Sequence, residues 1–255
     1  MGAGHGHTLH YHGHSLLHRM PAHLKVVAVL GFVLAVVATP PEQYWAFAVH
    51  AALVGAAVIA SRVPVRYLAA RLVIEVPFLG FAALMPFVST GPRVDVLGLS
   101  LSSAGLLGGW ALVAKGTLGV LASLVLATTT EPRDLLRGLE RLRLPRQLTQ
   151  IMGFMVRYVD VVGDEMRRMR VARESRGFSA RSPRHWGVLA QSAGALFIRA
   201  YERGERVHLA MLSRGYSGTL PAGHDVATTR ADAARAAILP GCALLVALLA
   251  VQAMR

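Results

Sequence analysis

Long apolar runs separated by short polar loops dominate the first half of the chain, and one further run lies near its end. An α-helix needs about 20 apolar residues to cross the hydrocarbon core of a membrane. The first run is short and spans only if its polar ends reach the interface, whereas the others approach or exceed this length. The pattern therefore predicts five membrane-spanning helices, at residues 24–38, 45–60, 72–88, 101–128 and 236–254.

Residues 131–235 follow a different pattern, because they are dense in arginine and contain no uncharged stretch of spanning length. Charges such as Arg157 and Asp160 interrupt the apolar positions, which is typical of amphipathic helices that lie on or just under a membrane. The sequence thus predicts an all-α membrane protein with about five transmembrane helices and an amphipathic helical domain inserted before the last one. Prolines divide that domain into three helical pieces: Pro132, Pro145, Pro183 and Pro221.

Lysine and arginine are distributed unevenly between the loops, and this asymmetry indicates the orientation of the chain. With the N-terminus inside, the tail, the loop at 62–71 and the region 131–235 are cytoplasmic, and Arg93 and Arg255 are the only cations outside. We therefore expect a multi-pass protein of the cell (inner or plasma) membrane with a cytoplasmic N-terminus. The predicted domains are a His-rich cytoplasmic tail (1–23), transmembrane helices 1–4 (24–130), the cytoplasmic domain (131–235) and transmembrane helix 5 (236–255).

Composition narrows the classes of function. The chain is 54% hydrophobic with a mean hydropathy of +0.46, which is more apolar than an ordinary soluble domain. Its net charge of +13 would suit a nucleic-acid binder, but the long uncharged runs exclude that class, so no nucleic-acid partner is expected. The sequence has no GxxxxGK[ST], HExxH or GxSxG motif, so we expect a non-catalytic protein that does not itself hydrolyse ATP.

Two charged residues fall inside predicted spans. Lys115 lies near the middle of the fourth run, and Glu75 lies near the start of the third. A charge at membrane depth is a functional candidate by default. The alternatives are that Lys115 reaches the interface or pairs with Glu75, and that Glu75 is satisfied by Arg71, its i,i+4 neighbour.

The N-terminal tail is rich in histidine. The alternating His10, His12 and His14 could present imidazoles to a divalent metal, which makes them the metal-ligand candidates of this chain. No cysteine or carboxylate joins them. A soluble tail with a compositional bias accounts for the same pattern.

A nine-residue motif occurs twice, at residues 175–183 and 213–221. Both copies have Ser, Arg, Gly, an aromatic residue, Ser and a final Pro at the same positions. Each copy follows a predicted helix, and glycine after a last turn that carries arginine is typical of a helix C-terminus. Each end would present a guanidinium beside an aromatic ring, which suits an acidic, apolar-walled groove on a partner. Two copies predict two such grooves; two ordinary helix caps are the alternative. The residues are Ser175, Arg176, Gly177, Phe178, Ser213, Arg214, Gly215 and Tyr216.

These paired motifs resemble those of the transmembrane T components of energy-coupling factor (ECF) transporters, and within that family the CbiQ type of cobalt transport. The family's two Ala-Arg-Gly motifs correspond to Ser175-Arg176-Gly177 and Ser213-Arg214-Gly215, with serine in place of alanine. The stretches 128–130 and 142–145, the basic Lys115 and the Gly- and His-rich start also match. The resemblance covers essentially the whole chain.

The resemblance implies that residues 131–235 form a coupling domain. It implies two cytoplasmic ABC ATPase subunits (CbiO-like) as partners, which bind ATP and Mg, and a membrane substrate-binding subunit (CbiM-like, with or without a small CbiN-like subunit). Arg176 and Arg214 would anchor the helix ends in ATPase grooves, and Phe178 and Tyr216 would pack at the groove lips. The resemblance further implies that membrane lipid surrounds the spans, that the transported ion is cobalt, and that this chain binds no cofactor of its own.

Other functions fit the same residues. A sister T component would serve nickel or a vitamin, because a partner subunit selects the substrate. A lipid-binding membrane scaffold would need no ATPase, since an arginine-rich domain also binds lipid headgroups. A stand-alone metal permease would use the His-rich tail. Subunits that co-purify with the chain distinguish these classes.

Overall fold

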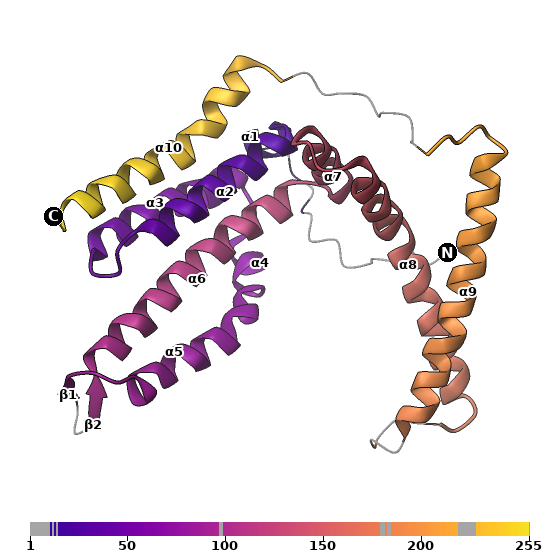
Figure 1. Cartoon of the computed structure of the whole chain (residues 1–255), viewed down its shortest axis with the longest axis horizontal. Coiled ribbons are helices and arrows are strands. Elements are labelled where there is room, and N and C mark those ends of the chain that lie inside the picture. Colours follow the sequence, from indigo (N-terminus) through magenta and orange to yellow (C-terminus); the bar gives the residue numbers. More distant parts are fainter. Residues whose placement is uncertain are drawn as a thin grey trace. The chain divides into compact units, whose positions relative to one another are not determined.

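A computed structural model describes residues 11, 13, 15–96, 99–178, 182, 185–218 and 228–254 of the chain (Figure 1). The described residues form two compact units. One unit comprises residues 11–142 and 228–254, and the other comprises residues 143–218.

The first unit is a bundle of helices with one short hairpin of strands. Its elements are α1 (Leu16–Arg19), α2 (Ala22–Ala38), α3 (Tyr44–Ser61), α4 (Val65–Ala69), η1 (Leu72–Glu75), α5 (Val76–Val88), β1 (Arg93–Val96), β2 (Leu99–Ser102), α6 (Ser103–Thr129), α7 (Pro132–Arg141) and α10 (Arg230–Gln252). The second unit holds α8 (Arg146–Glu174) and α9 (Trp186–Leu212).

The predicted all-α architecture with about five membrane spans is confirmed. Four segments are long and apolar enough to cross a membrane: Tyr44–Ser61, Val65–Val88, Ser103–Thr129 and Arg230–Gln252. The shorter apolar helix α2 corresponds to the first predicted run. The protein is therefore an all-α membrane protein with about five spans, and three further helices, α7, α8 and α9, lie between the fourth and fifth.

Two local features differ from the sequence pattern. The third span is broken, because α4 ends at Ala69 and a 3₁₀ turn, η1, precedes α5. The segment between the third and fourth predicted spans contains the antiparallel pair β1 and β2, in which Arg93 lies opposite Ser102. Strands of four residues are too short to give a hydrophobic period that stands out from a loop.

Helices α7 and α10 lie at the domain limits predicted at residues 130 and 235. Helix α7 packs against α2, and a Cβ at its Gly138 would lie only 2.7 Å from the backbone nitrogen of His23. Helix α10 begins at Arg230, where Thr229 and Asp232 form a capping box. The arginine-rich helices that form the second compact unit are α8 and α9.

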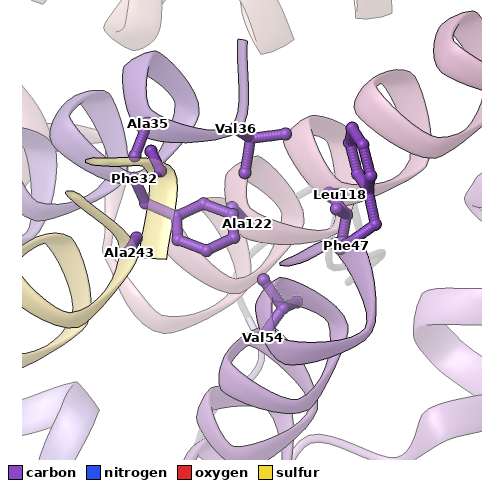
Figure 2. Packing of buried hydrophobic residues seen from close by; sticks show 9 residues of the cluster. Phe32, Ala35, Val36, Phe47, Val54, Leu118, Ala122 and Ala243 are labelled. Carbon is purple, nitrogen blue, oxygen red and sulfur yellow. The ribbon is translucent and has the colours of Figure 1, made fainter. Parts of the chain in front are cut away.

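The core of the first unit surrounds α2 (Figure 2). Phe32 of α2 is fully buried, and side chains from three other helices meet it and its neighbours. Many of these contacts involve alanine, which lets helix backbones approach closely where lipid supplies no hydrophobic driving force. The cluster comprises Phe32, Ala35, Val36, Phe47, Val54, Leu118, Ala122, Ala243 and Ala247.

Two lysines join α2 to α6, which run antiparallel. Lys25, in the first turn of α2, donates to the carbonyl of Thr129 (2.8 Å) and to the hydroxyl of Thr130 (3.0 Å) at the end of α6. Lys115 of α6 donates to the carbonyl of Val37 (2.8 Å) in the last turn of α2. The last carbonyls of a helix lack intrahelical partners and carry partial negative charge, so each lysine satisfies the C-terminus of the other helix.

Helices α5 and α6 approach each other through two glycines one turn apart. A Cβ at Gly105 would lie 2.5 Å from the carbonyl oxygen of Met85, and one at Gly109 would lie 2.8 Å from that of Ala82. Such small residues at i and i+4 permit close backbone contact between membrane helices.

We predict that Gly105→Ala lowers the thermal stability of the purified protein in mild detergent. The added methyl group meets backbone atoms of α5, so the helices must separate, at a cost of roughly 1–3 kcal/mol. Gly119→Ala in the same helix is the matched control, because nothing lies within 4 Å of its Cβ position. Its melting temperature should stay equal or rise, and equal destabilisation by both changes would contradict the α5–α6 contact.

Candidate functional site

The second unit is an antiparallel pair of long helices, α8 and α9. Three side-chain contacts join the two helices. From one contact to the next, the α8 residue lies closer to the start of the chain and its partner, in or just after α9, lies closer to the end. Arg173 donates to the hydroxyl of Ser192, Arg199 pairs with Glu165, and the Tyr216 hydroxyl donates to the side-chain oxygen of Gln150 (3.1 Å). The residue numbers of each pair have nearly the same sum, as expected for two helices that run in opposite directions.

Glu165 is the electrostatic centre of this hairpin. Its carboxylate accepts from Arg168 of the same helix (2.8 Å) and from Arg199 of α9. Hydrogen bonds from Arg168 and then Arg199 lower the pKa of Glu165 from its ordinary value of 4.5. The contribution of this contact to stability is therefore complete above pH 4.5 and is lost as the pH falls through the lowered pKa.

The first Ser-Arg-Gly motif closes α8. The amide of Phe178 donates to the carbonyl of Arg173 (3.1 Å), and the amide of Gly177 donates to that of Glu174 (3.0 Å). These two hydrogen bonds define a Schellman C-cap, and its left-handed residue is Gly177, with φ +75°.

The second motif closes α9 in the same way. The amide of Tyr216 donates to Met211 (3.0 Å), the amide of Gly215 donates to Leu212 (3.0 Å), and Gly215 has φ +82°. The correspondence extends to the serines, since Ser175 donates to the carbonyl of Ala172 (3.1 Å) and Ser213 donates to that of Ala210 (3.0 Å). The sequence repeat is therefore also a repeat of structure.

Both arginines are free to bind a partner. Arg176 and Arg214 are exposed, and neither forms a salt bridge with any described residue. The aromatic residues beside them are half-buried: Phe178 packs edge-on against His185, with ring centroids 5.2 Å apart, and Tyr216 is held by Gln150. Each helix end thus presents a planar guanidinium, which can bind carboxylates through two parallel hydrogen bonds, beside a fixed ring.

The antiparallel arrangement places the two motifs at opposite ends of the hairpin. Arg173, near the first motif, contacts the first turns of α9, whereas Tyr216, in the second motif, contacts the first turns of α8. A helix of 27 residues such as α9 is about 40 Å long. The two ends can therefore engage two separate binding grooves but not a single one.

An apolar groove of about 530 Å³ lies between α8 and α9. On the α8 side, apolar lining residues recur at every fourth position. On the α9 side, the lining includes one cation, Arg203. Sequence analysis predicted the amphipathic helices but missed the groove, although this spacing was a signal for it. The groove is lined by Phe154, Met155, Tyr158, Val159, Val162, Ala200, Arg203, Gly204, Val207 and Met211.

The remaining candidates do not join this site. Lys115 and Glu75 lie in the first unit and contact Val37 and Thr117, respectively, rather than each other. His10, His12 and His14 lie outside the described residues. Within the described part of the chain, no group of three or more His, Cys, Asp or Glu is placed to hold a metal ion.

Comparison with known proteins relates the chain to a family of transport proteins. The family model of the cobalt transport protein CbiQ matches residues 13–224. The chain is 31% identical over 196 residues to a cobalt transport protein CbiQ from Rhodobacter capsulatus, covering 77% of this chain and 78% of that protein. It is 28% identical over 224 residues to an energy-coupling factor transporter transmembrane protein EcfT from Bacillus selenitireducens, covering 81% of each.

We predict that Gly177→Ala and Gly215→Ala each loosen the end of one helix. Alanine in the left-handed conformation costs about 1 kcal/mol, so the amides of Phe178 and Tyr216, respectively, should exchange hydrogen about fivefold faster. Hydrogen exchange with mass spectrometry measures this directly. Gly163→Ala, in the interior of α8 with open space at its Cβ, is the control and should not accelerate exchange at either end. Unchanged protection in both cap variants would show that the glycines are not required for the caps.

Proposed function

The chain belongs to the family of CbiQ cobalt transport proteins, and from this premise we propose that it is the T component of an ECF-type ABC importer for cobalt ions. Relatives named as CbiQ and as the ECF transmembrane protein EcfT match about four-fifths of it. In this role the chain is non-catalytic. It transmits motion from two CbiO-like ATPase subunits, which bind and hydrolyse ATP with Mg, to a CbiM-like substrate-binding subunit in the membrane.

The observation that carries this proposal is the pair of equivalent helix ends, whose arginines form no salt bridge with any described residue. A Schellman cap fixes the backbone of each arginine beside a half-buried ring, so the backbone loses little conformational entropy when the guanidinium docks. Movement of the two ATPases on binding ATP would act on both ends of the hairpin at the same time. Because α8 and α9 are joined at Glu165, Arg199 and Tyr216, the hairpin would transmit this motion as one body.

The membrane partner would contact the apolar face of the same hairpin. Met155 is 64% exposed and Phe197 is 71% exposed, which is unusual unless lipid or another subunit covers them. A CbiM-like subunit, with or without a CbiN-like one, would bind cobalt and would respond to movement of this face. Cobalt is the cargo of the complex, and nickel or a vitamin is the alternative cargo of a sister T component.

We predict that Arg176→Glu or Arg214→Glu weakens the association with the ATPases and that the double change abolishes both the complex and metal uptake. Reversal places a carboxylate against an acidic groove, so it should be more harmful than substitution by alanine. A desolvated arginine at an interface commonly contributes 2 kcal/mol or more, so each single variant should bind at least roughly thirtyfold more weakly. The measurement is pull-down of the ATPases together with cobalt uptake in the same cells.

Arg167→Glu is the control for charge reversal, because it makes the same charge change on an exposed arginine within α8, about two turns before the helix ends at Glu174. It should leave ATPase recovery near the wild-type level. A double variant, Arg176→Glu with Arg214→Glu, that still binds both ATPases and transports cobalt would reduce the motifs to ordinary helix caps. A chain that never recovers ATPases would favour the lipid-binding scaffold instead.

We predict that the hairpin and the N-terminus are cytoplasmic. A cysteine at Ser217, in a background where Cys242→Ala removes the natural thiol, should react with a membrane-impermeant maleimide only after the cells are opened. A cysteine at Glu42, in the loop between the first two spans, should react in intact cells. Reaction of the Ser217 cysteine from outside would reverse the orientation inferred from the charge asymmetry.

A further inference from the structure

Glu75 is a buried acid inside the third span that is only partly satisfied. It ends η1, within the segment Val65–Val88, and is 7% exposed. Its Oε2 accepts a hydrogen bond from the hydroxyl of Thr117 in α6 (3.0 Å). Its Oε1 is buried and has no hydrogen-bond partner among the described residues. An unpaired polar atom at membrane depth is costly and is rarely retained without a role.

The basic residues expected to satisfy Glu75 are engaged elsewhere. Arg71 lies 3.6 Å from the ring centroid of Tyr67 and donates to the hydroxyl of that residue (2.7 Å). Lys115 donates to the carbonyl of Val37. The pairs Arg71–Glu75 and Lys115–Glu75, which the sequence offered as alternatives, therefore do not form. Arg71 instead contacts Tyr67, and Lys115 instead donates to the carbonyl of Val37.

A cavity of about 160 Å³ borders this carboxyl group, between α5 and α6. Phe78 and Leu79 of α5 and Leu112 of α6 give it apolar walls, and Glu75 and Thr117 are the polar residues among those described. None of the described lining residues is a cation. At Gly116 a Cβ would meet nothing within 4 Å, so this part of the wall is open to an incoming group.

The span that carries Glu75 is the one least covered by the rest of the chain. Only 17% of its window is buried, compared with 22–28% for the other three long spans. Phe78 is 60% exposed and Leu79 is 44% exposed, beside the cavity. The cavity thus lies on a face that the protein leaves for lipid or for another membrane helix.

We propose that this cavity is an intramembrane docking site for a transmembrane helix of the substrate-binding subunit, and that this helix inserts a lysine-like side chain toward Oε1 of Glu75. The inference rests on the proposed function, since it requires a membrane partner. A lysine combines an apolar stem with an ammonium head, which matches apolar walls and a single free carboxyl oxygen. An amino phospholipid is a poorer match, because its phosphate would enter a site without a described cation.

The test uses the full chain co-expressed with its transporter subunits and purified in mild detergent through a tag on this chain. Glu75→Gln preserves the size of the side chain and an acceptor for Thr117 but removes the charge. It should lower recovery of the membrane subunit between about threefold and tenfold, the range expected for polar contacts between membrane helices. Glu131→Gln, an exposed carboxyl outside the spans, is the matched control and should change nothing.

A photo-reactive amino acid at Val113, in the cavity wall, identifies the occupant. It should cross-link to a transmembrane segment of the membrane subunit that contains a lysine or arginine. Exchanging the charges, with Glu75→Lys in this chain and glutamate at the cross-linked basic position, should restore recovery.

Wild-type recovery with Glu75→Gln, cross-linking to lipid alone, or failure of the charge exchange would each overturn the inference. The ATPases provide an independent readout in the same samples. Their recovery should be unchanged by Glu75→Gln, which shows that the variant is folded. Loss of the ATPases from the wild-type complex would count against the proposed function, whereas recovery of the membrane subunit reports on the cavity separately.

Discussion

The reciprocal contact between α2 and α6 is the interaction on which the membrane bundle depends. The last carbonyls of a helix lack intrahelical partners, so they need donors from elsewhere in the protein or from water. Lys25 and Lys115 supply them at the C-termini of two antiparallel helices, and the core around Phe32 is built on the same pair. Both lysines are thereby committed to structure, and neither is left for Glu75.

This commitment separates two kinds of charged group in the molecule. The lysines of the bundle and Glu165 of the hairpin are paired within the chain and hold helices together. Arg176 and Arg214, by contrast, are presented by stable caps without partners among the described residues. The protein therefore leaves unpaired charge where we propose that another subunit supplies the complement, in the cytoplasm for the arginines and in the membrane for Glu75.

The position of the repeated motif at both ends of the α8–α9 hairpin distinguishes it from an ordinary helix cap. A Schellman cap alone would be only a way to end a helix. Two such caps at opposite ends of one antiparallel pair, joined by Tyr216 and Gln150 at one end and by Arg173 and Ser192 at the other, form a single element with two equivalent contact points. An element of this kind can receive force from two partners and deliver it to a third through its exposed apolar face.

The sequence by itself determined the helices, the spans and the two caps, because hydrophobic period, proline positions and the Arg-Gly signature are local properties of the chain. It also marked Lys115 and Glu75 as functional candidates and left their partners open: Lys115 could reach the interface or pair with Glu75, and Glu75 could pair with Arg71. Only the tertiary structure decided their partners. A long, flexible side chain forms hydrogen bonds with whichever polar group the packed helices bring near it. The hairpin register, the groove along Phe154 and the cavity beside Glu75 were likewise decided by tertiary structure, because each is formed by residues that lie far apart in the sequence.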